Sequence, residues 1–189
     1  MSTTAPTSSP QLRIELRSNP LFLSGVRELV VAVSRRLGFT DEAGGQIALA
    51  VDEALCNVIR HGYKKAPDRP IWLSLWAEGG AWSNGPPVPT GGTGDERPDA
   101  IRIVIEDEAQ QVDPAVIRSR NLDEIRPGGL GVHIIKTVMD EAAYEKRDGA
   151  GKGMRLTMMK KRVGSAGSSP RLGGGCGCAE KGKGDKCNG

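Results

Sequence analysis

The sequence predicts an α+β fold: a two-layer α/β sandwich in which a mixed, mostly antiparallel sheet carries helices on one face. Apolar and polar residues alternate in short segments such as 11–17 and 70–77, as they do in strands with one buried face. Helical segments fall in pairs between the strands, giving the order strand, two helices, two strands, two helices, two strands. Hydrophobic residues make up 38% of the chain and aromatic residues 4%, so an aliphatic core is expected.

The first strand is predicted over 11–17. A helix over 20–37 should follow, because Asn19 can cap its free amides and a proline fits its first position. Thr40 should open a second helix that continues to about His61. A glycine follows each of these helices, and glycine is a common helix terminator.

Two strands over 70–77 and 101–106 enclose the segment 78–100, which holds six glycines and four prolines. This composition predicts a long loop inserted between neighbouring strands, and not a separate domain. The remaining predicted elements are helices near 114–120 and over 130–140 and strands over 142–147 and 153–161.

One ordered domain is therefore expected over 11–162, with disordered segments at 1–10 and 163–189. The C-terminal segment is rich in glycine and lysine and contains three of the four cysteines. Three thiols without a histidine fall short of the four ligands of a closed zinc site. An alternative hypothesis is that this tail makes the chain a scaffold that binds metal or nucleic acid.

Charge is almost balanced outside the tail, with 22 lysines and arginines against 21 acidic residues in 1–163. A nucleic-acid-binding surface needs clustered cations, so no direct contact with nucleic acid is predicted. No apolar run approaches the roughly 20 residues that span a bilayer, and the N-terminus lacks the features of a secretory signal. We therefore expect a cytoplasmic protein without membrane contact.

The second predicted helix carries Glu53, Asn57 and His61 at positions i, i+4 and i+8, so the three side chains share one stripe. A carboxylate, an amide and an imidazole in one row can order a hard cation and a proton acceptor together. The amide oxygen of Asn57 suits Mg²⁺, which takes few protein ligands and keeps several waters. The alternative interpretation is an ordinary solvated helix face.

The run RPGGLGVHIIK, which starts at Arg126, places Gly128, Gly129 and Gly131 directly before a helix. Backbone amides that no Cβ obstructs form an anion site at a helix N-terminus, and the arginine adds a fork suited to phosphate oxygens. Asp107 ends the strand that lies between these two features in the sequence. Taken singly, the glycine run also fits a flexible loop that ends in a helix start, and the aspartate also fits an ordinary turn residue.

The order of these motifs resembles that of the GHKL ATPase superfamily, whose fold is the Bergerat or histidine-kinase-like fold. The resemblance rests on EAxxNxxxHGY, a strand ending in aspartate, and RxGGLG leading into a helix, and it covers residues 11–162. Within the superfamily the chain is most similar to the bacterial anti-sigma factor serine/threonine kinases. This resemblance implies ATP and Mg²⁺ as cofactors. It also implies a homodimer that phosphorylates an anti-anti-sigma partner of the STAS type and sequesters a sigma factor in its other state.

The resemblance also implies roles for individual residues. Glu53 would take the proton from the attacking hydroxyl, Asn57 would hold Mg²⁺ against the phosphates, and His61 would lie on the phosphate side. Asp107 would accept a hydrogen bond from the adenine amino group, and Arg126 would reach the γ-phosphate. The lid around the phosphates would consist of Gly128, Gly129, Leu130 and Gly131.

The chain departs from the family pattern beside the adenine site. Ala109 and Gln111 stand in the two glycine positions of Asp-x-Gly-x-Gly, and Met154 stands where a threonine is usual. These changes weaken the adenine contacts more than the phosphate chemistry, since a Cβ can narrow a pocket that the backbone must line closely. The leading prediction is a protein serine kinase. The alternative is a nucleotide-binding regulator that captures a partner without transferring phosphate.

Overall fold

The computed structural model describes residues 9–79, 97–118, 130–147 and 152–163. Several features predicted from the sequence lie outside these residues, namely most of the loop 78–100, Arg126, Gly128, Gly129 and almost all of the tail. The parts of the predicted site that can be placed are therefore the stripe on the second helix, the strand that ends in Asp107, and the beginning of the helix after the glycines.

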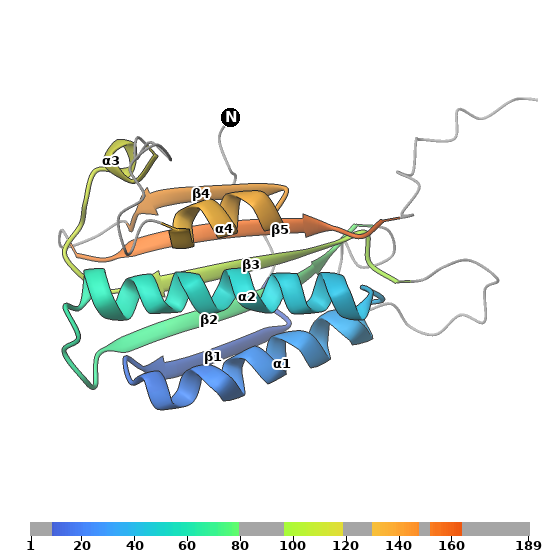
Figure 1. The fold of residues 1–189 in the computed structure, drawn as a ribbon, viewed down its shortest axis with the longest axis horizontal. Coiled ribbons are helices and arrows are strands. Elements are labelled where there is room, and N and C mark those ends of the chain that lie inside the picture. Colours follow the sequence, from blue (N-terminus) through green and yellow to red (C-terminus); the bar gives the residue numbers. More distant parts are fainter. Residues whose placement is uncertain (1–8, 80–96, 119–129, 148–151, 164–189) are drawn as a thin grey trace, which may run out of the picture.

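The described strands form one sheet with the order β1-β2-β3-β5-β4, in which every neighbouring pair is antiparallel (Figure 1). The predicted α+β sandwich is confirmed. The sheet is antiparallel throughout the described residues, whereas the sequence also allowed a mixed one. The strands are β1 (Leu12–Arg17), β2 (Pro70–Glu78), β3 (Ala100–Asp107), β4 (Glu141–Lys146) and β5 (Met154–Lys161).

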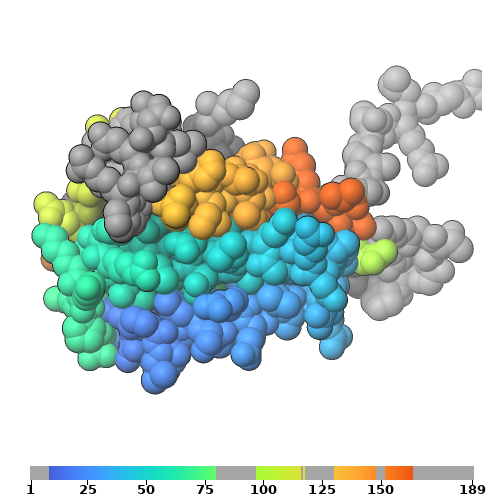
Figure 2. Space-filling model, in the orientation of Figure 1, coloured from blue at the N-terminus to red at the C-terminus, as the bar shows by residue number. Residues whose placement is uncertain are grey.

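Three helices, α1, α2 and α4, lie side by side across one face of the sheet (Figures 1 and 2). A 3₁₀ turn, η1, precedes α1, and a π turn, η2, continues α2. None of the described helices is long and apolar enough to cross a lipid bilayer. The bounds are η1 (Pro20–Phe22), α1 (Leu23–Arg36), α2 (Asp41–Asn57), η2 (Val58–Gly62), α3 (Pro114–Arg118) and α4 (Leu130–Val138).

Side-chain caps explain where the first two helical segments begin. Oδ1 of Asn19 accepts a hydrogen bond from the amide of Leu21 at 3.0 Å, and Oγ1 of Thr40 accepts one from the amide of Ala43 at 3.2 Å. Both predicted starts are confirmed. The first turn after Asn19 is a 3₁₀ turn, and the α-helical geometry of α1 begins only after it.

The core lies between the sheet and these helices. Because side chains alternate across a strand, one face of β2 presents an isoleucine and leucines to the helices, and one face of β3 presents isoleucines. Helix α2 contributes apolar side chains spaced three or four residues apart to the same core. The fully buried side chains include Ile47, Val51, Leu55, Ile71, Leu73, Ile101, Ile103 and Ile105.

The sheet register places Asp107 on the helix-covered face. Asp107 pairs with Ile71 of β2 and follows Ile105 by two positions, so its side chain continues a row of buried isoleucines. Glu106 lies between them and points to the opposite face. The row therefore ends in a carboxylate beside the end of η2, where Gly62 lies close to Ala109.

Two glycines should respond to alanine in opposite directions. Gly45 lies within α2 with open space around a Cβ, so Gly45→Ala should raise the free energy of unfolding by about 1 kcal/mol. Gly153 has a φ of +93°, and a Cβ there would lie 2.2 Å from the carbonyl oxygen of Asp107. Gly153→Ala should therefore lower the free energy of unfolding by at least about 1–3 kcal/mol. Urea unfolding measures both changes, and a Gly153→Ala protein as stable as the parent would contradict the described turn.

Candidate active site

The polar stripe of α2 lies against the first turn of α4. A Cβ built on Gly131 would lie 2.8 Å from Oε2 of Glu53 and 3.2 Å from Nδ2 of Asn57. The backbone of α4 therefore passes close to both side chains, and a Cβ at position 131 would require the Glu53 side chain to shift. The structure brings together three predicted site residues from two separate segments of the chain, Glu53 and Asn57 of α2 and Gly131 of α4.

The side-chain amide of Asn57 is incompletely satisfied. Its Nδ2 atom is buried and makes no hydrogen bond within the described part of the chain. A buried polar atom without a partner costs about 1–3 kcal/mol, so native structures rarely keep one without a reason. The unpartnered atom is a donor, so Asn57 can still bond an acceptor such as a phosphate oxygen.

The helix that carries the stripe changes its winding after Asn57. The amide of Tyr63 donates to the carbonyl oxygen of Val58 at 2.8 Å, which is the i to i+5 bond of a π turn. The sequence predicted ordinary helical geometry through His61, and this detail is corrected. Because a π turn holds more residues per turn, His61 does not continue the i+4 stripe, and its side chain is exposed. The wider turn instead brings Tyr63 into the core, where it is 8% exposed.

Asp107 is a buried carboxylate that backbone amides hold in place. Its Oδ1 atom accepts hydrogen bonds from the amide of Ala109 at 2.8 Å and from that of Met154 at 3.2 Å. The residue is 5% exposed, and burial raises the pKa of Asp107 because the charged form loses its hydration. The two amides and the nearby Arg147 guanidinium oppose that increase. The carboxylate is therefore preorganised at the end of β3.

Ala109 contributes a methyl group to the core beside this carboxylate. The residue is 4% exposed, and its Cβ would lie 3.0 Å from a Cβ built on Gly62. The methyl group thus packs against the end of η2, where a glycine leaves room for it. Gln111, in the other altered position, donates from Nε2 to the carbonyl oxygen of Arg147 at 2.9 Å.

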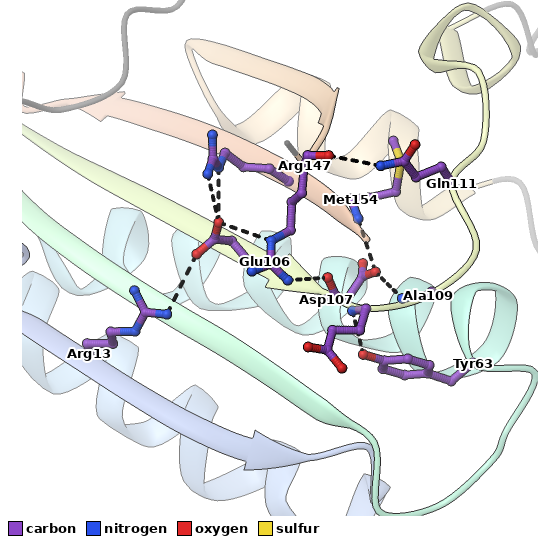
Figure 3. Close-up of polar contacts among 10 residues, drawn as sticks. Arg13, Tyr63, Glu106, Asp107, Ala109, Gln111, Arg147 and Met154 are labelled. Carbon is purple, nitrogen blue, oxygen red and sulfur yellow. Dashed lines mark hydrogen bonds and ion pairs between the residues drawn. The ribbon is translucent and has the colours of Figure 1, made fainter. Parts of the chain in front are cut away.

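Two residues that the sequence did not single out hold the backbone next to Asp107 (Figure 3). The hydroxyl of Tyr63 accepts a hydrogen bond from the amide of Glu108 at 2.7 Å and donates one to the carbonyl oxygen of Pro70 at 2.6 Å. Nη1 of Arg147 donates to the carbonyl oxygen of Asp107 at 2.8 Å. Tyr63 belongs to the HGY end of the motif and could have been noticed there, whereas no local pattern marks Arg147.

An ionic cluster lies on the opposite face of the sheet, around Glu106 (Figure 3). Arg155 donates from Nε and Nη2 to Oε1 of Glu106 at 3.1 and 2.9 Å, and Nε of Arg147 lies 3.5 Å from the same oxygen. Arg13 lies 3.8 Å from the other carboxylate oxygen. The guanidinium of Arg147 also lies 5.0 Å from the centre of the Trp72 ring, within cation–π range.

Comparison with known proteins agrees with this geometry. Residues 16–160 match the family described as the histidine kinase-like ATPase domain. The chain belongs to this family. The family predicted from the order of the motifs is therefore confirmed, and with it the predicted fold class.

The relatives include protein kinases. The chain is 27% identical over 160 residues to the serine-protein kinase RsbW of Staphylococcus aureus strains bovine RF122 / ET3-1 and MRSA252, covering 79% of this chain and 89% of the relative. Among solved structures, the SiaB–SiaC complex from Pseudomonas aeruginosa matches with a TM-score of 0.50 and 9% identity, over 79% of this chain and 89% of that one. The likeness to the solved structure concerns the fold.

The raised pKa of Asp107 determines how its contribution to stability depends on pH. A carboxyl group whose pKa is higher in the folded than in the unfolded state stabilises the fold while it is protonated. That contribution is complete below the ordinary value of 3.8 and is lost as the pH rises through the folded pKa. Asp107→Asn keeps an oxygen acceptor but cannot ionise. Its free energy of unfolding, relative to that of the parent, should therefore increase from acid to neutral pH.

Denaturant unfolding at a series of pH values measures this difference. Asp113→Asn provides the baseline, because Asp113 is exposed and its Oδ1 also accepts one backbone amide, that of Ala115 at 2.9 Å. A difference between Asp107→Asn and the parent that stays flat or decreases toward neutral pH would contradict the effect of burial on Asp107.

Proposed function

We propose that this protein is an ATP-dependent serine/threonine protein kinase of the anti-sigma factor type, which phosphorylates a small anti-anti-sigma partner and regulates transcription by partner switching. The observation that carries the proposal is the approach of Gly131 to Glu53 and Asn57. Phosphoryl transfer needs a cation ligand, a group that orients the nucleophile, and donors that approach the phosphates. The kinase name of the RsbW relatives supports the same activity.

The residues at this place fit a magnesium ion. Mg²⁺ in nucleotide sites takes one or two protein oxygens, and phosphates and water supply its other ligands. The side-chain oxygen of Asn57 is a ligand of the kind that Mg²⁺ takes, and the Glu53 carboxylate adds negative charge near it. The described residues contain no cluster of three His, Cys, Asp or Glu side chains that could hold a metal, so nucleotide and water would complete the coordination. A bound Mg²⁺ would neutralise phosphate charge.

The nucleotide would lie between this place and Asp107. The Asp107 carboxylate, already fixed by two backbone amides, would accept the amino group of adenine. Amides at the start of α4, from Leu130 and Gly131 onward, would face the phosphates, because the N-terminus of a helix attracts anions. His61, which is exposed on the π turn, would lie on the phosphate side. Arg126, Gly128 and Gly129, which precede α4 in the sequence, would complete the lid.

Glu53 would act as the general base. Its carboxylate would take the proton from a serine or threonine hydroxyl of the partner while that oxygen attacks the γ-phosphorus. The bond from the γ-phosphorus to the bridging oxygen would break, and ADP would leave with the electron pair. Because the protein forms no covalent bond to the phosphoryl group, orientation and charge neutralisation would supply most of the rate enhancement.

A second candidate is a nucleotide-binding regulator that sequesters a partner without phosphoryl transfer. Met154 favours it, because its amide bonds the Asp107 carboxylate and a thioether stands there where the family resemblance implies a threonine. The amides of Ala109 and Met154 also both bond Oδ1 of Asp107. Only the other carboxylate oxygen is then left to bond the base. Both candidate functions include the same further proposals: the protein would form a homodimer, lie in the cytoplasm and sequester a sigma factor.

Asn57→Ala should abolish Mg²⁺-dependent ATP binding and leave the fold intact. The substitution removes the proposed cation ligand together with a buried donor that has no partner among the described residues. Calorimetry with ATP in Mg²⁺ and in EDTA measures the effect, and circular dichroism checks the fold. Gln46→Ala removes an exposed amide from the same helix and should bind as the parent does. Unchanged affinity of the Asn57→Ala protein for Mg-ATP would show that the site is assigned wrongly.

Glu53→Gln should separate the kinase from the regulator. Glutamine keeps the shape but takes no proton, so Mg-ATP should bind about as well as to the parent. Transfer of phosphate to a partner serine should decrease by roughly 10²–10⁴-fold. Labelling of the partner from γ-labelled ATP measures transfer. The control is Asp52→Asn, because that neighbouring carboxylate pairs with Arg27 at 3.2 Å and should leave transfer unchanged.

Two outcomes would contradict the kinase mechanism as proposed. Full labelling by Glu53→Gln would remove Glu53 from the chemistry. A parent protein that binds its partner in a nucleotide-dependent way, yet transfers no phosphate, would establish the regulator instead.

A further inference from the structure

The peptide group between Asp107 and Glu108 is held from both sides by side chains. Arg147 donates to its carbonyl oxygen at 2.8 Å, and its N–H donates to the hydroxyl of Tyr63 at 2.7 Å (Figure 3). The regular pairing of β3 with β5 stops one residue earlier, at the pair of Glu106 with Arg155. Beyond the last β3–β5 pair, the side chains of Tyr63 and Arg147 therefore supply the hydrogen bonds that hold the β3 backbone.

Both side chains are themselves firmly placed. The hydroxyl of Tyr63 also donates to the carbonyl oxygen of Pro70 at 2.6 Å, which ties the end of η2 to the start of β2. The Arg147 guanidinium is fixed by Glu106 and by the Trp72 ring, and the amide of Arg147 donates to the carbonyl oxygen of Gly153 at 3.1 Å. A side chain that is already anchored loses less rotamer entropy when it forms a hydrogen bond than a mobile side chain does. Its hydrogen bond therefore restrains the partner more strongly.

The direction of the Asp107 carboxylate depends on this peptide group. One of its oxygens is bound to the amides of Ala109 and Met154, so the other oxygen points wherever the backbone at Asp107 and Glu108 directs it. A tilt of that peptide would move the amide of Ala109 and the carboxylate together. Base recognition by a single carboxylate oxygen tolerates little tilt, because hydrogen bonds weaken steeply as they bend.

We propose that Tyr63 and Arg147 are positioning residues for base recognition, which clamp the Asp107–Glu108 peptide and thereby aim the Asp107 carboxylate at the exocyclic amino group of a purine. This inference rests on the nucleotide-binding part of the proposed function and does not require phosphoryl transfer. A purely structural role for the same bonds would stabilise the end of the sheet without distinguishing one base from another.

The test compares Mg-ATP with Mg-ITP, because inosine carries a carbonyl oxygen where adenine carries the amino group. Calorimetry gives both dissociation constants for the parent, Tyr63→Phe, Arg147→Met and the double variant. The parent should prefer ATP by tenfold or more. Each single variant should lose about tenfold in affinity for ATP, the effect of about one hydrogen bond, and little for ITP. The double variant should lose less than the product of the two single losses, since both act on one peptide group.

Matched controls remove the same kinds of side chain at other places in the sheet. Tyr144→Phe removes a buried hydroxyl that has no hydrogen-bond partner in the described residues. Arg13→Met removes another arginine that contacts Glu106 and that makes no bond to the clamped peptide in the described part of the chain. Both variants should keep the preference for ATP over ITP.

An independent measurement needs no nucleotide and no stable variant of Arg147. Hydrogen exchange should show the Glu108 amide protected in the parent and exchanging at least about tenfold faster in Tyr63→Phe, but not in Tyr144→Phe. Equal losses of ATP and ITP affinity, or an unprotected Glu108 amide in the parent, would overturn the clamp. A parent that prefers ATP but phosphorylates no partner would contradict the kinase and leave the clamp standing. A parent that binds neither nucleotide would overturn both.

Discussion

The burial of α2 against the sheet is the interaction on which the site depends. Ile47, Val51 and Leu55 are fully buried, and each such side chain contributes about 1.5–3 kcal/mol when removed from water. These contacts fix the rotation of the helix about its axis. The polar stripe is therefore turned away from the sheet and toward α4, and the geometry of Glu53 and Asn57 follows from packing elsewhere on the same helix.

At the end of β3, in contrast to the apolar packing of α2, a polar side chain lies on the buried face of the sheet. Asp107 continues the row of Ile103 and Ile105 on the covered face. Burial of a carboxylate is costly unless hydrogen bonds replace its water, and two backbone amides do so here. A group that is retained at such cost and aimed by its surroundings is typical of a binding site.

The π turn η2 joins these two places. Asn57 immediately precedes it and Tyr63 immediately follows it, so one wide turn connects the proposed cation ligand to the clamp beside Asp107. Gly62, at its end, leaves space for the Ala109 methyl group. An ordinary helical turn would rotate Tyr63 to a different azimuth and move its hydroxyl away from Glu108. Single π turns inside helices are frequent at functional sites, and here the reason is geometric.

The sequence by itself determined the strands and helices, their order, and the polar and glycine residues of which Glu53, Asn57 and Gly131 meet in the fold. These features depend on near neighbours in the chain: the alternation in β1, the caps at Asn19 and Thr40, and the i+4 spacing of Glu53 and Asn57. Family membership followed from the same local motifs and their order.

Only the tertiary structure decided how those residues meet. The winding of η2 depends on the tertiary surroundings of Tyr63, and no local preference in VIRHG specifies it. The contact of Gly131 with Asn57 and the hydrogen bond of Arg147 to Asp107 both join distant segments. Such contacts form because the sheet brings the ends of β3, β4 and β5 together and because α4 packs beside α2. Their partners are set by register and packing, which single-residue patterns do not encode.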